Sequence, residues 1–204
     1  QIHQGFHNVK LARTGGEANA IAIRIARAST KKNKIAVCGY HGWHDWYLSS
    51  NLTKKNSLKD HLLSGLNTDG VPSILKNTVY TFNYNNLKQF NSIINKHKIS
   101  AVMMEVSRSY QPKNNFLKQI RKITKKKNIT LIFDECTSGF RQTYGGLHKH
   151  YGIEPDMAIF GKSLGNGYPI TAIIGNKKVM KYAQSSFISS TFWSERSGYV
   201  AALK

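Results

Sequence analysis

Three ionisable residues come directly after apolar runs of the kind that form buried strands. Glu105 follows Ala-Val-Met-Met, Asp134 follows Leu-Ile-Phe, and Lys162 follows Met-Ala-Ile-Phe-Gly. Taken singly, each has a simple structural explanation, since an acid after a strand often caps the next helix and a loop lysine is often solvated. In a parallel sheet, however, the carboxyl ends of the strands meet at one edge, and ligands bind there. The three residues therefore predict a shared site.

A glycine turn stands before the first amphipathic segment. Gly15 and Gly16 precede residues 17–28, in which apolar side chains recur at helical spacing. The first N–H groups of a helix point out of its end, where the helix dipole favours an anion. The turn therefore predicts a site for a phosphate group.

These residues together match the demands of pyridoxal phosphate. The cofactor needs an amine for its aldehyde, a carboxylate for its ring nitrogen, a site for its phosphate and a surface on which its ring packs. Lys162 is expected to supply the amine, with burial lowering its pKa so that it is nucleophilic. Asp134 supplies the carboxylate, Gly15 and Gly16 bind the phosphate, and Tyr40 stacks on the ring.

The elements that must position these side chains alternate along the chain. Strands are expected at residues 34–38, 78–82, 100–104, 129–133 and 157–160, and helices at residues 17–28, 87–97 and 116–126. This alternation predicts an α/β fold with a mostly parallel sheet and helices on both faces. Residues 39–46 are expected to form a loop, residues 49–77 have no clear assignment, and His148 and His150 are expected on a solvated surface helix.

Six segments, in order along the chain, carry a resemblance to a known family. They are Thr14-Gly15-Gly16-Glu17-Ala18-Asn19, Tyr40-His41-Gly42, Asp134-Glu135-Cys136-Thr137-Ser138-Gly139-Phe140-Arg141, Tyr151-Gly152-Ile153-Glu154-Pro155-Asp156, Gly161-Lys162-Ser163-Leu164-Gly165-Asn166-Gly167-Tyr168-Pro169 and Ser190-Thr191-Phe192-Trp193. The chain resembles class III pyridoxal-phosphate-dependent aminotransferases, in the branch that contains glutamate-1-semialdehyde 2,1-aminomutase. The similarity extends over nearly all of the sequence. It implies the large domain of a fold-type I transferase.

The resemblance also implies an activity and a catalytic pair. Lys162 resembles the Schiff-base lysine, and Asp134 resembles the partner of the pyridine nitrogen. The implied reaction is amino-group transfer from a small-molecule donor to a carbonyl acceptor, by an aminotransferase or an aminomutase. The sequence does not identify the substrates.

Further cofactor contacts follow from the same resemblance. Gly15 and Gly16 match the phosphate loop, Tyr40 the stacking aromatic residue, and Glu105 an acidic residue near the cofactor. Cys136 falls where the family places a residue that packs against the ring face. Thr191 resembles a threonine that reaches the phosphate of the neighbouring subunit, which implies a homodimer with a shared active site.

The chain departs from the family in three places. Many relatives have a hydroxyl residue at the position of Gly16, and Pro commonly follows the position of Glu105, where this chain has Val106. Tyr110 lies where some relatives have Asn. Relatives are also longer, so residues 1–204 are interpreted as an incomplete cofactor-binding domain, without the N-terminal segment and the C-terminal small domain of the family.

The charge of the chain suggests a second class of function. It has 30 Lys+Arg against 10 Asp+Glu, a formal net charge of +20. A Lys-rich protein that binds polyanions or nucleic acid, on a non-catalytic scaffold of the same fold, is the alternative hypothesis. The basic residues are dispersed and no nucleic-acid-binding motif accompanies them, so no specific nucleic-acid partner is expected.

A metal site is the third hypothesis. His41 and His44 are spaced like neighbours on a helical turn, but no helix is evident around Gly39–Gly42 and no cysteine ligand is assigned to them. Packing of the loop is the favoured interpretation of both histidines, and no metal is expected.

The cysteines and the hydropathy of the chain indicate the cellular compartment of the protein. Cys38 and Cys136 lie far apart and each follows an apolar run, which indicates reduced thiols and a cytoplasmic protein. The apolar runs are only a few residues long, against the ~18–20 residues that a spanning helix needs. No membrane association is expected.

Overall fold

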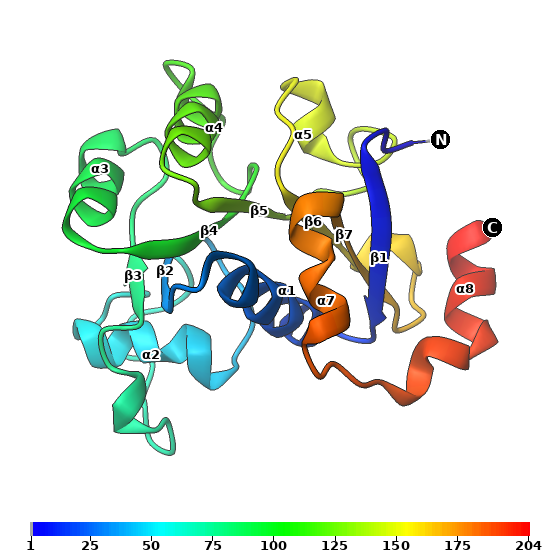
Figure 1. Cartoon of the computed structure of the whole chain (residues 1–204), viewed down its shortest axis with the longest axis horizontal. Helices are drawn as coiled ribbons and strands as arrows, with labels where there is room; N and C mark the ends of the chain where they lie inside the picture. Colours follow the sequence, from blue (N-terminus) through cyan, green and yellow to red (C-terminus); the bar gives the residue numbers. More distant parts are fainter. Residues whose placement is uncertain (1) are drawn as a thin grey trace.

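A seven-stranded sheet runs through the protein, and helices cover both of its faces (Figure 1). The computed structural model describes residues 2–204, without the side chains of Thr191 and Phe192. The strands follow the order β1-β7-β6-β5-β4-β2-β3 across the sheet. Their bounds are β1 Phe6–Ala12, β2 Lys34–Cys38, β3 Val79–Thr81, β4 Ile99–Glu105, β5 Thr130–Asp134, β6 Met157–Phe160 and β7 Thr171–Asn176.

The sheet is mostly parallel, as the sequence predicts, but one side of it is antiparallel. Strands β3, β2, β4, β5 and β6 pair in parallel, whereas β7 pairs antiparallel with both β6 and β1. Only a loop and a short 3₁₀ turn, η2 (Lys162–Leu164), connect β6 to β7. Because a parallel crossover needs a dozen or more residues, usually including a helix, this short connection requires the antiparallel arrangement.

Eight α-helices surround the sheet within the described residues. Their bounds are α1 Gly15–Thr30, α2 Asp45–Thr53, α3 Leu87–Lys96, α4 Phe116–Lys126, α5 Leu147–His150, α6 Lys177–Met180, α7 Tyr182–Ser185 and α8 Arg196–Leu203. The three helices expected from the sequence are present. No helix of the described chain combines the length and the apolar character needed to cross a membrane.

Helix α2 begins at Asp45, within the segment expected as a loop, and continues into the part of the sequence that has no clear assignment. Asp45 in its first turn complements the positive end of the helix dipole. Trp46 and Tyr47 are buried, and they join the core that α1 makes with the sheet. Trp46 and Tyr47 therefore anchor α2 to the core.

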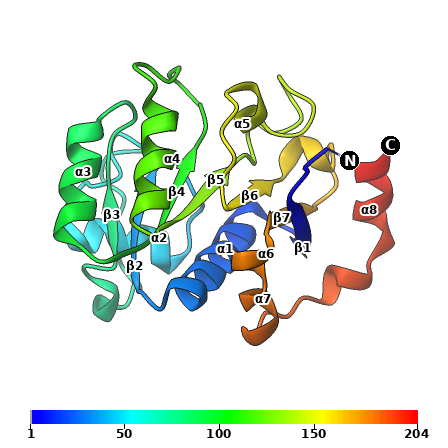
Figure 2. The same cartoon turned by 45° about the horizontal axis from the view of Figure 1, so that its top comes forward.

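Two apolar cores lie on opposite faces of the sheet (Figure 2). Successive strand residues point to opposite faces, so in β4 Ala101 and Met103 face α1 while Val102 and Met104 face the helices α3 and α4. Since parallel strands are buried on both faces, they form continuous apolar runs rather than alternating patterns. This is the origin of the short apolar runs that end at the candidate site.

Helix α4 shows how one face is attached. Phe116, Leu117 and Ile120 are buried, and burying side chains of this size stabilises a fold by about 1.5–3 kcal/mol each. The lysines of the helix occupy its exposed side. The periodicity of the sequence predicts this helix with its bounds.

A single carboxylate joins α4 to the start of two strands. Asp156 accepts hydrogen bonds from both terminal nitrogens of Arg121, at 2.8 and 3.1 Å, and from the backbone N–H of Leu131 at 2.9 Å. Asn176 at the end of β7 donates a further bond of 3.1 Å. Asp156 is therefore a structural anchor between α4, β5, β6 and β7.

We expect Asp156→Ala to lower the free energy of unfolding by about 2–4 kcal/mol, because it removes a bidentate ion pair and leaves polar groups unsatisfied. Chemical denaturation of the purified protein measures this. Glu154→Ala deletes an exposed carboxylate two residues away and should change stability by less than about 0.5 kcal/mol. Equal effects of the two substitutions would contradict the anchor.

Candidate active site

Two acidic residues lie next to each other at the carboxyl ends of neighbouring strands. Glu105 ends β4, Asp134 ends β5, and the two are directly paired in the register of the sheet. Both side chains are buried. The apolar strands bring the two carboxylates together, as their positions in the sequence predict.

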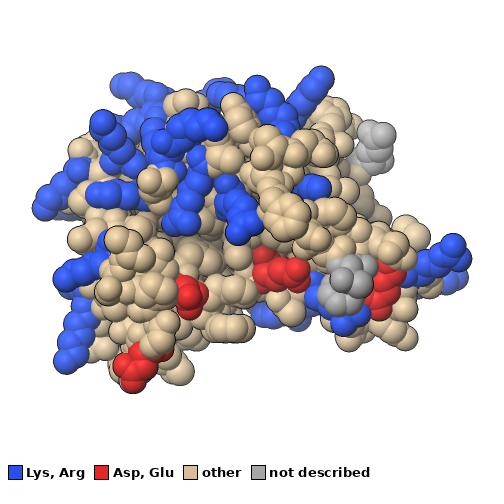
Figure 3. Space-filling model, turned by 60° about the horizontal axis from the view of Figure 1, so that its bottom comes forward, with Lys and Arg blue, Asp and Glu red and all other residues tan. Residues whose placement is uncertain are grey.

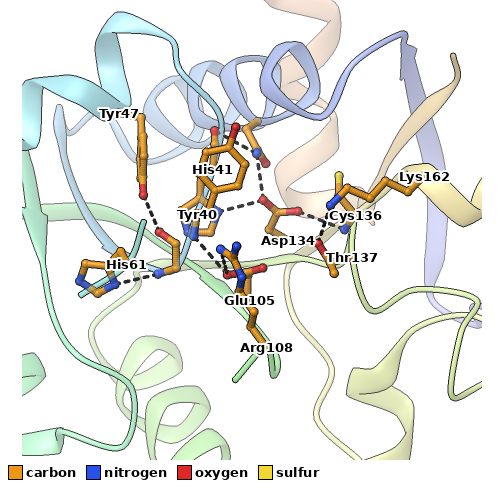
Figure 4. Close-up of polar contacts among 12 residues, drawn as sticks. Tyr40, His41, Tyr47, His61, Glu105, Arg108, Asp134, Cys136, Thr137 and Lys162 are labelled. Carbon is orange, nitrogen blue, oxygen red and sulfur yellow. Dashed lines mark hydrogen bonds and ion pairs between the residues drawn. The ribbon is translucent and has the colours of Figure 1, made fainter. Parts of the chain in front are cut away.

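Asp134 is held by three donors from other parts of the fold (Figure 4). His41 Nδ1 lies 2.9 Å from its Oδ2, and Asn19 Nδ2 of α1 donates to the same oxygen at 2.9 Å. The backbone N–H of Cys136 donates to the other oxygen, Oδ1, at 3.1 Å. Asn19 also donates to the His41 carbonyl at 3.2 Å, so α1 and the loop after β2 are both fixed on this carboxylate.

The hydrogen bonds keep Asp134 ionised despite its burial. Burial raises the pKa of a carboxyl group, but the hydrogen bond and charge of His41, with the bonds from Asn19 and Cys136, outweigh it, so the pKa of Asp134 is lowered. The Nε2 atom of His41 is buried and has no hydrogen-bond partner among the described residues. Asp134 is therefore a fixed anion at neutral pH.

Glu105 has a different electrostatic setting. Burial raises its pKa, and the charge of His41 and the hydrogen bond from Tyr40 only partly offset this effect. The Tyr40 N–H donates to its Oε2 at 3.1 Å, and Arg108 Nη1 lies 3.6 Å from the same oxygen. Two adjacent carboxyl groups thus have pKa values displaced in opposite directions, a pattern typical of sites where one residue must stay ionised.

An open cleft is lined by Gly39, the residue before Tyr40. The cleft encloses about 570 Å³ and is lined by Glu105, Arg108 and His61, among others. The guanidinium carbon of Arg108 lies 5.7 Å from the centre of the Tyr40 ring. Tyr47 fixes the preceding turn, because its hydroxyl donates to the Gly39 carbonyl at 2.7 Å.

The start of α1 presents free backbone donors where the glycines of the sequence predict an anion site. Thr14 caps the helix by accepting from the Glu17 N–H at 3.2 Å, and Glu17 in return accepts from the Arg13 N–H at 2.9 Å. This reciprocal cap leaves Gly15 and Gly16 as the first two helical residues, whose N–H groups point out of the helix end.

The absence of a side chain at Gly16 has a structural reason. A Cβ atom there would lie 2.8 Å from the imidazole of His44, and a Cβ on Gly42 would lie 2.8 Å from the Gly16 Cα. The two glycines therefore allow the loop after β2 to approach the start of α1. A side chain at position 16 would require the His44 ring to move.

Cys136 packs between two other glycines. Its sulfur would lie 3.2 Å from a Cβ on Gly15 and 3.3 Å from a Cβ on Gly161. Burial and the nearby Asp134 raise the pKa of the thiol, so it stays protonated. Cys136 therefore acts as a packing residue at the floor of the site rather than as a nucleophile.

Lys162 lies in η2, directly after β6, and its amine points toward Thr137 (Figure 4). Its Nζ donates to the Thr137 hydroxyl at 2.9 Å. The backbone at Lys162 has a φ of 45°, in the left-handed region, which turns the chain abruptly at the strand exit. The expectation that burial desolvates Lys162 is wrong for this chain, because the turn stands at the rim of the sheet and leaves the side chain exposed.

The structure brings all but one of the predicted site residues to one edge of the sheet. Seven of them lie at the start of α1 or at strand exits: Gly15, Gly16, Tyr40, Glu105, Asp134, Cys136 and Lys162. Thr191 falls in the 3₁₀ turn η3 (Thr191–Ser194), and its side chain lies outside the described residues. Its predicted contact with a neighbouring subunit stays a prediction.

Two residues of the site, His41 and Asn19, are not identified as functional by the sequence reasoning. Both lie within segments that carry the family resemblance, and this is the signal in the sequence that could identify them as functional. The sequence favours loop packing for His41, whereas the structure shows that it contacts Asp134 directly. Within the described residues, no group of three or more His, Cys, Asp or Glu is placed to hold a metal ion.

The prediction for His148 is wrong. It is buried, and its Nδ1 lies 2.5 Å from Glu135 Oε1. The carboxylate of Glu135 also accepts from the backbone N–H groups of Leu147 and His148, at 2.6 and 3.0 Å. The short helix α5 is thus capped and held by an acid that follows β5, which draws His148 into the interior. His150 is exposed, as expected.

The sequence matches the class-III aminotransferase family over residues 1–204. It is 37% identical over 203 residues to 3-aminobutyryl-CoA aminotransferase of Cloacimonas acidaminovorans, covering 95% of this chain and 45% of that protein. It is 42% identical over 180 residues to glutamate-1-semialdehyde 2,1-aminomutase of Nitrosopumilus maritimus, covering 84% of this chain and 41% of the other. The chain therefore spans less than half the length of these relatives.

A solved structure has the same fold. The omega-transaminase from Sphaerobacter thermophilus superposes with a TM-score of 0.84 at 28% identity, covering 99% of this chain and 49% of that one. The α/β architecture predicted from the sequence, that of fold-type I transferases, is confirmed.

The site also predicts a pH dependence of stability. His61 Nδ1 accepts from the Gly39 N–H at 3.2 Å, and burial, followed by the charge of His41, lowers the pKa of His61 from 6.5 to about 4. Between these two pH values the unfolded chain binds a proton that the folded chain does not. Stability must therefore fall as the pH falls from about 6.5 toward about 4.

We expect His61→Asn to reduce the loss of stability between neutral pH and about pH 5 by about 1–2 kcal/mol, since the Asn oxygen keeps an acceptor near the Nδ1 position without titrating. Denaturation at the two pH values measures the difference. His150→Asn, at an exposed histidine, should leave the pH dependence unchanged. The assignment fails if both variants keep the wild-type dependence.

Proposed function

The chain belongs to the class-III aminotransferase family, and on that premise we propose that the whole protein catalyses pyridoxal-phosphate-dependent amino-group transfer. The observation that carries the proposal is the ionised, buried Asp134 beside a strand exit that presents the Lys162 amine. Both an aminotransferase and an aminomutase use this arrangement, and the curated relatives include one of each.

Pyridoxal phosphate supplies an aldehyde that reacts with amines and a ring that accepts an electron pair from the substrate carbon. The described residues fit this group. Gly15 and Gly16 offer backbone donors and no side chain at the start of α1, which suits a phosphate. Tyr40 offers an aromatic face, and Cys136 gives a packed apolar surface.

Asp134 is assigned to hold a proton at the ring nitrogen of the cofactor. A carboxylate can do this only if it stays ionised, which the bonds from His41 and Asn19 ensure. His41 is therefore proposed as a positioning residue that acts through Asp134. Glu105 is proposed to lie near the cofactor, where it fixes the Tyr40 backbone.

Lys162 is assigned to hold the cofactor covalently and then to move a proton. When its amine is free, Nζ would take a proton from the substrate carbon that bears the amino group. The Thr137 hydroxyl, 2.9 Å from Nζ, orients the amine. The substrates are a small-molecule amino donor and a carbonyl acceptor.

We also propose how this chain relates to a working enzyme. Residues 1–204 form the cofactor-binding large domain, and an N-terminal segment and a C-terminal small domain belong to the whole protein. The protein is proposed to be a homodimer in which Thr191 reaches the phosphate site of the neighbouring subunit. Helix α8, whose residues are all at least partly exposed within the described chain, is consistent with further protein packing there.

A cytoplasmic location is proposed from the state of the cysteines. Cys38 and Cys136 are both free and buried, and burial raises the pKa of each thiol. Free thiols are the usual state in reducing compartments.

Lys162→Ala is expected to abolish the visible absorption that pyridoxal phosphate gains on covalent attachment to the protein, and to lower the rate of amino transfer by about 10³-fold or more. Absorbance spectroscopy of the whole protein measures the first effect. Borohydride reduction followed by peptide mass analysis should place the cofactor on the peptide that contains Lys162.

Lys177→Ala is the matched control, because it removes an exposed lysine of α6. It should keep both the absorption and the labelled peptide. A Lys162→Ala protein that still attaches the cofactor would refute the assignment.

The shared active site has its own test. Lys162→Ala and Thr191→Val subunits are refolded or expressed together at limiting cofactor. Random pairing should restore about one quarter of the wild-type activity, since half of the dimers then contain one intact site. Activity no greater than the sum of the separately made variants would contradict a site built from two subunits.

A further inference from the structure

Part of the positive charge of the protein converges on one groove that the proposed reaction does not use. Figure 3 shows Lys and Arg side chains gathered over the upper part of one face, with few Asp or Glu there. At the edge of the sheet opposite the candidate active site, two hollows of about 760 and 270 Å³ share Arg121, Lys125 and Asp156 in their walls. We call these two joined hollows the basal groove.

Lysines from separate elements converge on the basal groove. Lys149 of α5 lines the larger hollow, and Lys178 of α6 and Lys181 line the smaller one. Lys32 and Lys178 both contact Asn128, where their Nζ atoms lie 3.4 Å from its carbonyl oxygen and 3.3 Å from its Oδ1. Like charges are brought together here from positions far apart in the sequence.

Little negative charge in the groove balances these lysines. Its acidic lining residues are Asp156 and Glu154. Asp156 is already paired with Arg121 through two hydrogen bonds, so Glu154 is the remaining acidic lining residue that can offset the charge of the lysines. The net charge of the lining residues is therefore positive along the length of the groove.

Helix electrostatics explain only part of the cluster. Lys125 lies in the last turn of α4, where the negative end of a helix dipole attracts cations. That effect does not account for Lys32 and Lys178, which come from other elements and meet at Asn128. An anionic ligand removes the repulsion between these amines, since Lys binds phosphate as a point charge.

The groove favours a chain of phosphates over a nucleic-acid strand. Single strands gain much of their affinity by stacking bases on aromatic side chains. The aromatic side chain that lines the smaller hollow is Tyr182, and the amines of Lys31 and Lys181 lie over its ring at 5.7 and 5.2 Å. Cations rather than an open stacking surface thus dominate the wall of the smaller hollow, whereas His3, Phe6 and His148 line the larger one.

We propose that the basal groove binds an oligophosphate anion, a short chain of phosphate groups. The site lies at the amino ends of β5 and β6, whereas the candidate active site lies at their carboxyl ends. The two sites are therefore separate, and the proposal does not depend on the catalytic assignment.

The test is calorimetric titration of tripolyphosphate into the whole protein, loaded with pyridoxal phosphate so that the phosphate loop of α1 does not compete. We expect one ligand per chain, with an affinity that falls by roughly tenfold or more as salt rises from low to moderate concentration. Lys125→Gln with Lys178→Gln should weaken binding by at least tenfold. Lys149→Gln with Lys181→Gln should weaken it as well.

Lys118→Gln with Lys122→Gln is the matched control, because it removes the same charge from exposed positions of α4 outside the groove. It should bind as the wild type does. Equal losses in groove and control variants, or several weakly bound ligands per chain, would overturn the proposal. So would a single-stranded RNA of equal charge that binds more tightly than tripolyphosphate and is sensitive to both sets of substitutions.

Discussion

The structure depends on one buried, ionised carboxylate. Asp134 ends an apolar strand, where an unpaired charge would be too costly to bury. His41 and Asn19, from the loop after β2 and from α1, supply the hydrogen bonds that make it tolerable. The same contacts fix α1, whose first residues carry the proposed phosphate site. One interaction therefore sets both the charge and the spacing of the site.

Four of the ten acidic residues have a defined structural task. Asp134 and Glu105 occupy one edge of the sheet, Asp156 ties α4 to the other edge, and Glu135 holds α5 through His148. The net charge of +20 is left to the surface, where most lysines are solvated and a few converge on the basal groove. The two proposed anion sites thus lie at opposite edges of the sheet, one built from backbone donors and the other from amines.

Much of the fold and part of the site can be predicted from sequence, for identifiable reasons. Helix α4 has a clean apolar stripe and β6 a short apolar run, so both are predicted with their bounds. Strand β1 is half exposed and β7 pairs antiparallel, so the alternation of strands and helices does not reveal them. The burial of His148 and of Lys162 is mispredicted. His148 is buried because it contacts Glu135, and Lys162 is exposed because its turn stands at the rim of the sheet. His41 needed the structure, since only the fold brings it to Asp134.

The central claim is that Asp134 stays ionised in order to hold a proton at the ring nitrogen of the cofactor. It is tested most directly by ¹⁵N magnetic resonance of the whole protein loaded with pyridoxal phosphate labelled at that nitrogen. We expect a protonated nitrogen at and above neutral pH in the wild type, and loss of this proton in Asp134→Ala. A nitrogen that is unprotonated in the wild type, or equally protonated in both proteins, would contradict the role of Asp134.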